Sequence, residues 1–390
     1  MDNFSFYSPT YFSFGQGSLS GLGALVQRFG GHKVLVHYGG GSAERSGVLG
    51  QVRAALQAAG VPFTELGGVR PNPRSGLVYQ GIELCRAFGA DLVLAVGGGS
   101  VIDSAKAIAL GAVYDGDFWD LYALGATVQN ALPVGAVLTI AAAGSEGSPV
   151  SVITQEKGMY KRGGRGEALR PKFAVMDPTF TYSLPAYQTA CGATDILAHI
   201  CERYFTPTTG AEVTDRLCEA LLQTVIHQAP RALEQPDDYE ARANLMWAGM
   251  LAHNDTCGVG RRQDWASHAL EHELSALYDC AHGAGLAVMM PAWMKYVMPR
   301  HVARFAQFAV QVWGCQMDFE RPERTAAEGI RRLEQFLAGL GMPLTFAQLG
   351  AREEDIPRLI ETLCVNKAMP FGGLEPLGPE DAAAIYRLAL

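Results

Sequence analysis

Two short segments in the second half of the sequence concentrate residue types that bind metal ions. Asp195 and His199 are four residues apart, so on a helix both side chains lie on one face and can chelate one ion. Taken alone, such a pair also fits a solvated helix surface. The second segment changes this interpretation, because it holds His268, His272 and His282, three of only nine histidines. Together the two segments predict a metal site.

The ligand types limit the choice of metal. Imidazole and carboxylate ligands suit Fe²⁺, Zn²⁺ or Mn²⁺ better than Mg²⁺ or Ca²⁺, and such a set can leave one position open for substrate. The ion would act as a Lewis acid. His268 and His272 share a helix face and His282 follows at the next expected helix start, so spacing alone does not decide which two of the three bind it.

Two glycine-rich turns in the first half have the properties of a phosphate-binding site. Gly97, Gly98, Gly99 and Ser100 follow the apolar run 92–96 and precede a helical pattern. Glycines let the backbone approach a ligand, and free N–H groups at a helix start attract phosphate. The spacing is not the G-x-G-x-x-G fingerprint, and a plain strand-to-helix connection is the alternative. The order of strand, turn and helix predicts a pyrophosphate site.

The second turn bears on the choice of cofactor. It comprises Gly39, Gly40, Gly41 and Ser42. NAD-binding folds often carry an acidic side chain near this place, which accepts from the adenine ribose 2′-hydroxyl and repels a 2′-phosphate. This turn has no carboxylate, so NADP(H) is favoured over NAD(H). The alternative is a flexible turn without a cofactor role.

The elements that must position these residues differ between the two halves. Apolar runs alternate with amphipathic stretches over the first ~180 residues, which is typical of βα units around a mainly parallel sheet. Strands are expected at 33–37, 92–96 and 134–138, and helices at 48–59 and 77–88. We therefore expect a dinucleotide-binding α/β domain over residues 1–184.

Long helical patterns then take over, at 187–204, 211–228 and 301–312. They predict an all-α metal-binding domain over residues 185–390. Pro178 and Pro185 forbid a continuous helix across the boundary.

Two further segments carry structural expectations. The glycine-rich stretch 156–170 is expected to form an exposed loop or hairpin. The runs 4–7 and 11–14 alternate like edge strands that could pair across a homodimer.

Composition excludes several classes of protein. Of 390 residues, 48% are hydrophobic and 18% charged, which is typical of a globular enzyme large enough for two domains. A net charge of -8 with both signs mixed along the chain provides no basic face for nucleic acid. The eight cysteines form no C-x-x-C pair, and we find no secretory signal and no apolar run of ~20 residues. We expect a cytoplasmic protein that binds neither nucleic acid nor membranes.

Further motifs run almost from end to end of the chain. They are YGGGS from Tyr38, PNP from Pro71, VGGGSVIDSAKAIA from Val96, AAAGSEGSP from Ala141, KFAVMDP from Lys172, DILAH from Asp195 and QDWASHALEHELSALYDCAHG from Gln263. Together they resemble the iron-containing (group III) alcohol dehydrogenase family, and within it the butanol dehydrogenase and NADPH-dependent aldehyde reductase branch. The block from Gln263 is the most specific of them.

The resemblance implies a Rossmann-like domain followed by a helical domain, the dehydroquinate synthase-like architecture, with the active site in the cleft between them. It implies four metal ligands, which are Asp195, His199, His268 and His282. It places His272 beside the nicotinamide, where it is the candidate proton carrier. It also implies cofactor contacts from Gly40, Gly41, Ser42, Asn72, Gly98, Gly99, Ser100, Asp103, Thr139 and Lys161.

These features predict a metal-dependent alcohol dehydrogenase or aldehyde reductase. Hydride would pass between nicotinamide C4 and a small alcohol or aldehyde, with the metal polarising the substrate oxygen. A glycerol-type polyol dehydrogenase and a dehydroquinate synthase-like lyase are alternatives on the same fold, but a phosphorylated substrate would need more basic residues than Arg261 and Arg262. A metallohydrolase using Glu271 or Glu273 as base would leave both glycine turns unexplained, and a non-catalytic metal-binding protein is the remotest alternative.

Overall fold

The computed structural model describes residues 1–123 and 128–390, and the chain divides into two compact units. The α/β unit comprises Tyr7–Leu184 and Pro236–Asn254. The helical unit comprises Met1–Phe6, Pro185–Gln235 and Asp255–Leu390. The chain therefore passes between the units several times.

A six-stranded sheet forms the centre of the α/β unit. Its strand order is β1-β8-β5-β4-β2-β3, and every neighbouring pair is parallel. The strands are β1 Tyr11–Phe14, β2 Val34–Gly39, β3 Phe63–Val69, β4 Leu92–Gly97, β5 Val134–Leu138 and β8 Phe173–Met176. The strands expected at 33–37, 92–96 and 134–138 are confirmed as β2, β4 and β5.

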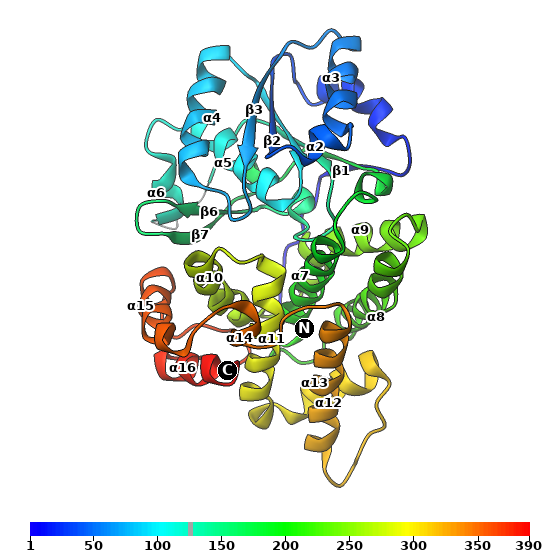
Figure 1. Ribbon diagram of the computed structural model, residues 1–390, viewed down its shortest axis with the longest axis vertical. Coiled ribbons are helices and arrows are strands. Elements are labelled where there is room, and N and C mark those ends of the chain that lie inside the picture. Colours follow the sequence, from blue (N-terminus) through cyan, green and yellow to red (C-terminus); the bar gives the residue numbers. More distant parts are fainter. Residues whose placement is uncertain (124–127) are drawn as a thin grey trace. The chain divides into compact units, whose positions relative to one another are not determined.

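Helices cover both faces of this sheet. Leu35 belongs to a buried cluster with residues of α4 (Ser75–Phe88) and α5 (Gly99–Val113). Its neighbours Val34 and Val36 belong to a second cluster, with residues of α1 and α3. Side chains alternate between the faces of a strand, so a strand buried on both faces must be apolar throughout. Figure 1 shows α3 and α4 on opposite sides of β2 and β3. The other helices of this unit are α1 Leu22–Arg28, α2 Ser42–Arg45, α3 Val48–Ala58, α6 Phe118–Ala123 and α9 Tyr239–His253.

The glycine-rich stretch forms part of a β-hairpin. Strands β6 (Val150–Gln155) and β7 (Tyr160–Arg165) pair antiparallel. The expected hairpin is therefore present, but the expected exposure is wrong for Lys161, which is 4% exposed. The reason is that the hairpin packs against α4 and α5. The local sequence of the hairpin does not predict that packing.

The N-terminal residues differ from expectation in one part. The run 11–14 is an edge strand, β1, whereas 4–7 forms no strand. The first six residues belong to the helical unit, where Asp2 N–H donates to the Gly260 carbonyl at 2.9 Å.

The helical unit packs three helices around the candidate metal ligands. Helix α11 contacts both α7 and α10. The helices of this unit are α7 Ala186–Tyr204, α8 Glu212–Glu234, α10 Ala266–Tyr278, α11 His282–Val297, α12 Val302–Trp313, α13 Pro322–Gly339, α14 Phe346–Leu349, α15 Ile356–Asn366 and α16 Pro379–Arg387. The helical patterns at 187–204, 211–228 and 301–312 are confirmed as α7, α8 and α12.

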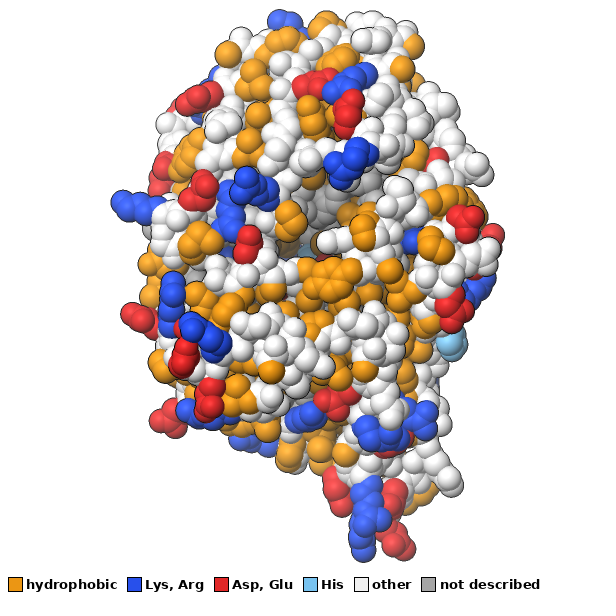
Figure 2. Space-filling model, viewed as in Figure 1, with side chains coloured by type: hydrophobic (Ala, Val, Ile, Leu, Met, Phe, Trp, Pro, Cys, Tyr) orange, Lys and Arg blue, Asp and Glu red, His pale blue; other side chains and the backbone are white. Residues whose placement is uncertain are grey.

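The surface charge and the helix lengths test the expectation that the protein binds neither nucleic acid nor membranes. Acidic and basic side chains are interspersed over the face shown in Figure 2. Across residues 1–123 and 128–390, every helix is too short or too polar to cross a membrane.

Candidate metal centre and cofactor site

Helix α7 supplies two of the four expected metal ligands. It begins after Pro185 and buries every residue from Thr189 to Tyr204. Asp195 and His199 lie one turn apart on its inner face, and Asp195 Oδ1 is 3.6 Å from His199 Nδ1. The i,i+4 spacing therefore brings the two side chains together, as expected.

The other two ligands come from α10 and α11. His268 lies in the first turn of α10, and the Asp264 side chain stabilises that turn by accepting the Ala266 N–H at 2.8 Å. Helix α10 ends at Tyr278, and the next residue, Asp279, has a left-handed φ of 50°. The chain reverses there, so His282 becomes the first residue of α11.

The three imidazoles converge on one carboxylate oxygen of the fourth ligand, Asp195. Asp195 Oδ1 lies 3.6 Å from His199 Nδ1, 3.9 Å from His268 Nε2 and 3.6 Å from His282 Nε2. Four ligands at about 2.1 Å around a tetrahedral ion are separated by roughly 3.4 Å. The spacing therefore suits one divalent cation bound between them.

Two of these atoms are also left without hydrogen-bond partners. Asp195 Oδ1 and His268 Nε2 are buried and accept or donate no hydrogen bond among the described residues. Burying such atoms is costly unless a ligand satisfies them. The donor set and its unsatisfied atoms thus fit a metal ion.

Acidic groups give the cluster a negative potential. Burial lowers the pKa of His268, but the nearby carboxylates of Asp195 and Glu202 outweigh burial and raise this pKa to about 9. A site that stabilises an imidazolium also stabilises a bound cation.

Two glutamates outside the expected ligand set contact the Nδ1 atoms of two of the ligand histidines. His268 Nδ1 is 3.1 Å from Glu202 Oε1, and His282 Nδ1 contacts Glu271 Oε2. Glu202 follows Asp195 by seven residues, a spacing that returns to the same helix face, and this is the signal that could have found it.

His272 lies beside the cluster on α10. Its ring centroid is 5.7 Å from that of His282 and 6.3 Å from that of His268. Ligand atoms of Glu271, His272 and His282 also lie within 4.8 Å of one another, like those of Asp195, His268 and His282. The set with Asp195 contains the carboxylate oxygen that lies within 3.9 Å of a ring nitrogen of His199, His268 and His282.

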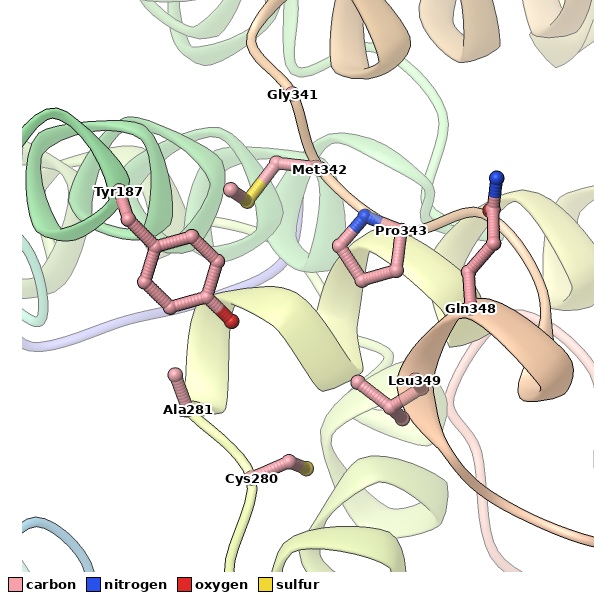
Figure 3. Close-up of a pocket in the computed structure, with 8 residues that line it drawn as sticks. All are labelled: Tyr187, Cys280, Ala281, Gly341, Met342, Pro343, Gln348 and Leu349. Atoms are coloured by element: carbon pink, nitrogen blue, oxygen red, sulfur yellow. The ribbon is translucent and has the colours of Figure 1, made fainter.

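A cavity of about 340 Å³ opens next to this region. Ala281, which directly precedes His282, lines it together with Cys280 and Tyr187. In Figure 3 the Tyr187 hydroxyl points toward the Cys280–Ala281 segment, and Met342 and Pro343 form the opposite wall.

The expected cofactor residues gather at the carboxyl edge of the sheet. Gly40 to Ser42 follow β2, Asn72 follows β3, Gly98 to Ser100 follow β4, and Thr139 follows β5. The carboxyl edge of a parallel sheet is where open α/β folds bind their ligands.

Each glycine turn has its own reason for lacking side chains. Gly41 needs a left-handed φ of 117° before α2. Gly98 has an ordinary φ of -95°, but a Cβ there would overlap Ile140. Close approach of the segment after β5 therefore excludes any larger residue at position 98.

The remaining two cofactor candidates, Asp103 and Lys161, are held by other residues. Lys161 Nζ donates to Asn72 Oδ1 at 3.0 Å, so two expected cofactor residues contact each other. Asp103 accepts from the Ser145 hydroxyl at 2.6 Å and the Val152 N–H at 2.9 Å. Its carboxylate therefore holds the segment that follows β5.

Comparisons with known proteins identify relatives over the whole length. The family profile described as iron-containing alcohol dehydrogenase matches residues 9–178, and the one described as Fe-containing alcohol dehydrogenase family, C-terminal, matches residues 189–390. The NADH-dependent butanol dehydrogenase A of Clostridium acetobutylicum is 39% identical over 388 residues, 99% of each chain. The NADPH-dependent aldehyde reductase YqhD of Escherichia coli is 37% identical over 392 residues, 100% of each chain.

A solved structure is similar throughout. The NADH-dependent butanol dehydrogenase A of Thermotoga maritima superposes with a TM-score of 0.97 and is 40% identical, covering 100% of this chain and 99% of that one. The names of these relatives agree on the reaction class but differ in cofactor.

Proposed function

The chain belongs to the iron-containing alcohol dehydrogenase family, and from that premise we propose that it is a metal-dependent, NADP(H)-linked reductase of small aldehydes. The family, the fold class and the alcohol dehydrogenase activity expected from the sequence are confirmed. The observation that supports a metal-dependent reaction is the convergence of three imidazoles on the unsatisfied Asp195 Oδ1.

The residues have separable tasks in this proposal. Asp195, His199, His268 and His282 would hold one divalent ion, Fe²⁺, Zn²⁺ or Mn²⁺. Such an ion, when bound, supplies positive charge that polarises a carbonyl oxygen. The carboxyl edge of the sheet would bind the dinucleotide, with its pyrophosphate at the N-terminus of α5. NADP(H) supplies the hydride.

His272 would move the proton that the reaction requires. It is buried on the helix that carries His268 and lies beside His282. Histidine titrates nearest to neutral pH, which suits an acid that protonates the product oxygen. We expect His272→Gln to lower kcat by roughly 10² and to flatten its pH profile while the metal is retained. An unchanged pH profile would contradict the role.

Arg45 supports NADP(H) as the preferred cofactor. Its Nη1 lies 3.1 Å from the point that a Cβ on Gly41 would occupy, and the guanidinium forms no ion pair with the described residues. The carboxylates of Glu44 and Glu65 are both engaged by Arg53, at 2.9 and 2.7 Å. An unpaired cation at this turn favours a 2′-phosphate.

The arginines near the metal cluster support an unphosphorylated substrate. Arg261 is buried and paired with Asp215 at 2.7 Å. Arg203 is buried and stacks on Trp265, 4.5 Å from its ring centroid. Neither guanidinium is available to a substrate phosphate. A metallohydrolase is also disfavoured, because Glu271 contacts His282 and Glu273 accepts from Asn366 at 3.1 Å.

The test is direct. Purified protein loaded with Fe²⁺ or Zn²⁺ should oxidise NADPH in the presence of butanal, followed by absorbance of the reduced nicotinamide. Chelator treatment should abolish turnover and added metal should restore it. Turnover that survives complete removal of the metal would contradict the proposal.

We also propose a cytoplasmic homodimer. All eight cysteines are free, as expected in a reducing compartment, and β1 lies at the edge of its sheet. Size-exclusion chromatography with light scattering tests the dimer.

A further inference from the structure

Glu202 links the first two helices of the metal cluster. It lies on α7, seven residues after Asp195, and its side chain is 3% exposed. One of its oxygens, Oε1, is 3.1 Å from His268 Nδ1 and accepts the His268 backbone N–H at 2.9 Å. The same carboxylate oxygen thus fixes both the start of α10 and the imidazole that this turn carries.

Glu271 makes the equivalent link between α10 and α11. It lies on α10, three residues after His268, and is fully buried, and its Oε2 contacts His282 Nδ1. The His282 side chain is 27% exposed, against 7% or less for the other three ligand side chains. Packing therefore restrains His282 least, and Glu271 is the group that fixes its ring.

Helix α11 is built to admit the Glu271 side chain. Gly285 lies one turn after His282, and a Cβ on it would be 2.8 Å from both Cγ and Oε1 of Glu271. A larger residue at this position would displace the carboxylate. The position of the Glu271 carboxylate therefore depends on the absence of a side chain at Gly285.

We propose that Glu202 and Glu271 are positioning residues for the metal centre, an inference that rests on the proposed function. Each carboxylate lies on one helix, engages Nδ1 of an imidazole on the next, and so directs Nε2 of that ring toward Asp195. A ligand histidine whose second nitrogen is held by a carboxylate keeps one tautomer and one orientation. The two carboxylates thereby connect α7 to α10 and α10 to α11.

The arrangement also sets the charge of the site. Asp195, Glu202 and Glu271 place three carboxylates in a buried cluster whose imidazoles are neutral when they bind metal. A divalent ion offsets most of that charge. The positioning residues therefore favour retention of a doubly charged cation in addition to orienting its ligands.

The test uses Co²⁺ as the metal, because its visible absorption reports ligand geometry. Glu271→Gln and Glu202→Gln keep the size of each side chain and remove its charge. We expect each to weaken Co²⁺ binding by roughly 10- to 100-fold and to shift the absorption spectrum. Gly285→Ala should shift the spectrum in the same sense as Glu271→Gln, because it displaces Glu271 and changes no charge.

Glu273→Gln is the matched control. Glu273 is a buried carboxylate of the same helix that accepts a hydrogen bond from Asn366, so this variant should bind Co²⁺ like the parent protein. Circular dichroism verifies that each variant is folded. Parental affinity and spectrum in both Glu→Gln variants would overturn the inference while leaving the proposed function standing. Failure of the parent protein to bind Co²⁺ at all would count against the proposed function.

Discussion

The candidate site of the helical unit consists of a carboxylate and three imidazoles that converge, whereas the candidate site of the α/β unit consists largely of glycine backbone. Three imidazoles approach Asp195 Oδ1 from three helices. At the edge of the sheet, Gly98 admits the neighbouring segment only because it lacks a Cβ. The first kind of site depends on electrostatics and the second on steric access, so they should fail differently when altered.

Removal of a ligand side chain should have the largest effect. His268→Ala should release the metal and lower kcat/KM by roughly 10³ or more, because several kcal/mol of transition-state stabilisation are lost. Metal analysis and steady-state kinetics measure both. The exposed His227 provides the control, since His227→Ala should change neither. Metal retained by the His268 variant would contradict the ligand assignment.

The buried carboxyl group of Glu146 tests whether electrostatics also matters in the α/β unit. Burial raises the pKa of Glu146 from its usual 4.5 to about 7. The folded protein therefore keeps this proton to higher pH than the unfolded chain. The free energy of unfolding should fall as pH rises from about 5 to about 7, by about 3 kcal/mol.

Glu146→Gln isolates this contribution. The variant lacks the titrating group, so its advantage in urea unfolding over the parent should grow between about pH 5 and about pH 7. If the unfolding free energies of variant and parent depend on pH in the same way, ionisation of Glu146 does not destabilise the α/β unit. Electrostatics would then matter in the helical unit and steric access in the α/β unit, as the comparison states.

Adding a methyl group to the glycine turn should have a smaller effect. Gly98→Ala should destabilise the α/β unit by about 1–3 kcal/mol and weaken dinucleotide binding, because the new Cβ overlaps Ile140. Gly50→Ala on α3 is the control, since a Cβ there meets nothing within 4 Å. That change should be neutral or stabilising by up to ~1 kcal/mol. Equal effects of the two substitutions would remove the steric argument.

The smallest effect is expected at Arg45. Arg45→Gln should weaken binding of 2′,5′-ADP about tenfold, which corresponds to about 1.4 kcal/mol for one exposed charged contact. AMP, which lacks the 2′-phosphate, should bind as before in the same calorimetric titration. An equal loss for both nucleotides would sink the assignment of Arg45 to the 2′-phosphate.

The same contrast explains how far the sequence predicts this molecule. Strands β4 and β5 are recognisable because burial on both faces makes them continuously apolar, and β2 is apolar over Val34–Val36 before the buried His37. Asp195 and His199 are recognisable because helix geometry makes residues four apart neighbours. Both signals are local, so no tertiary information is needed to find them.

What the sequence could not predict depends on contacts between distant segments. Lys161 resembles an exposed loop residue, yet it is buried against Asn72, 89 positions away. Glu271 has a visible spacing to His268, but its contact is with His282 on the following helix. Neither partner can be deduced until the packing of the hairpin and of the helices is known.

The position of β1 has a consequence for how the chain is made. This strand is at the edge of the sheet and pairs with β8, so Tyr11 lies opposite Phe173. During synthesis β1 cannot pair with β8 until the whole α/β segment up to β8 has left the ribosome. Until then the strand at the growing edge is uncovered and open to pairing with another chain. A nascent chain therefore completes its sheet with one of its oldest segments.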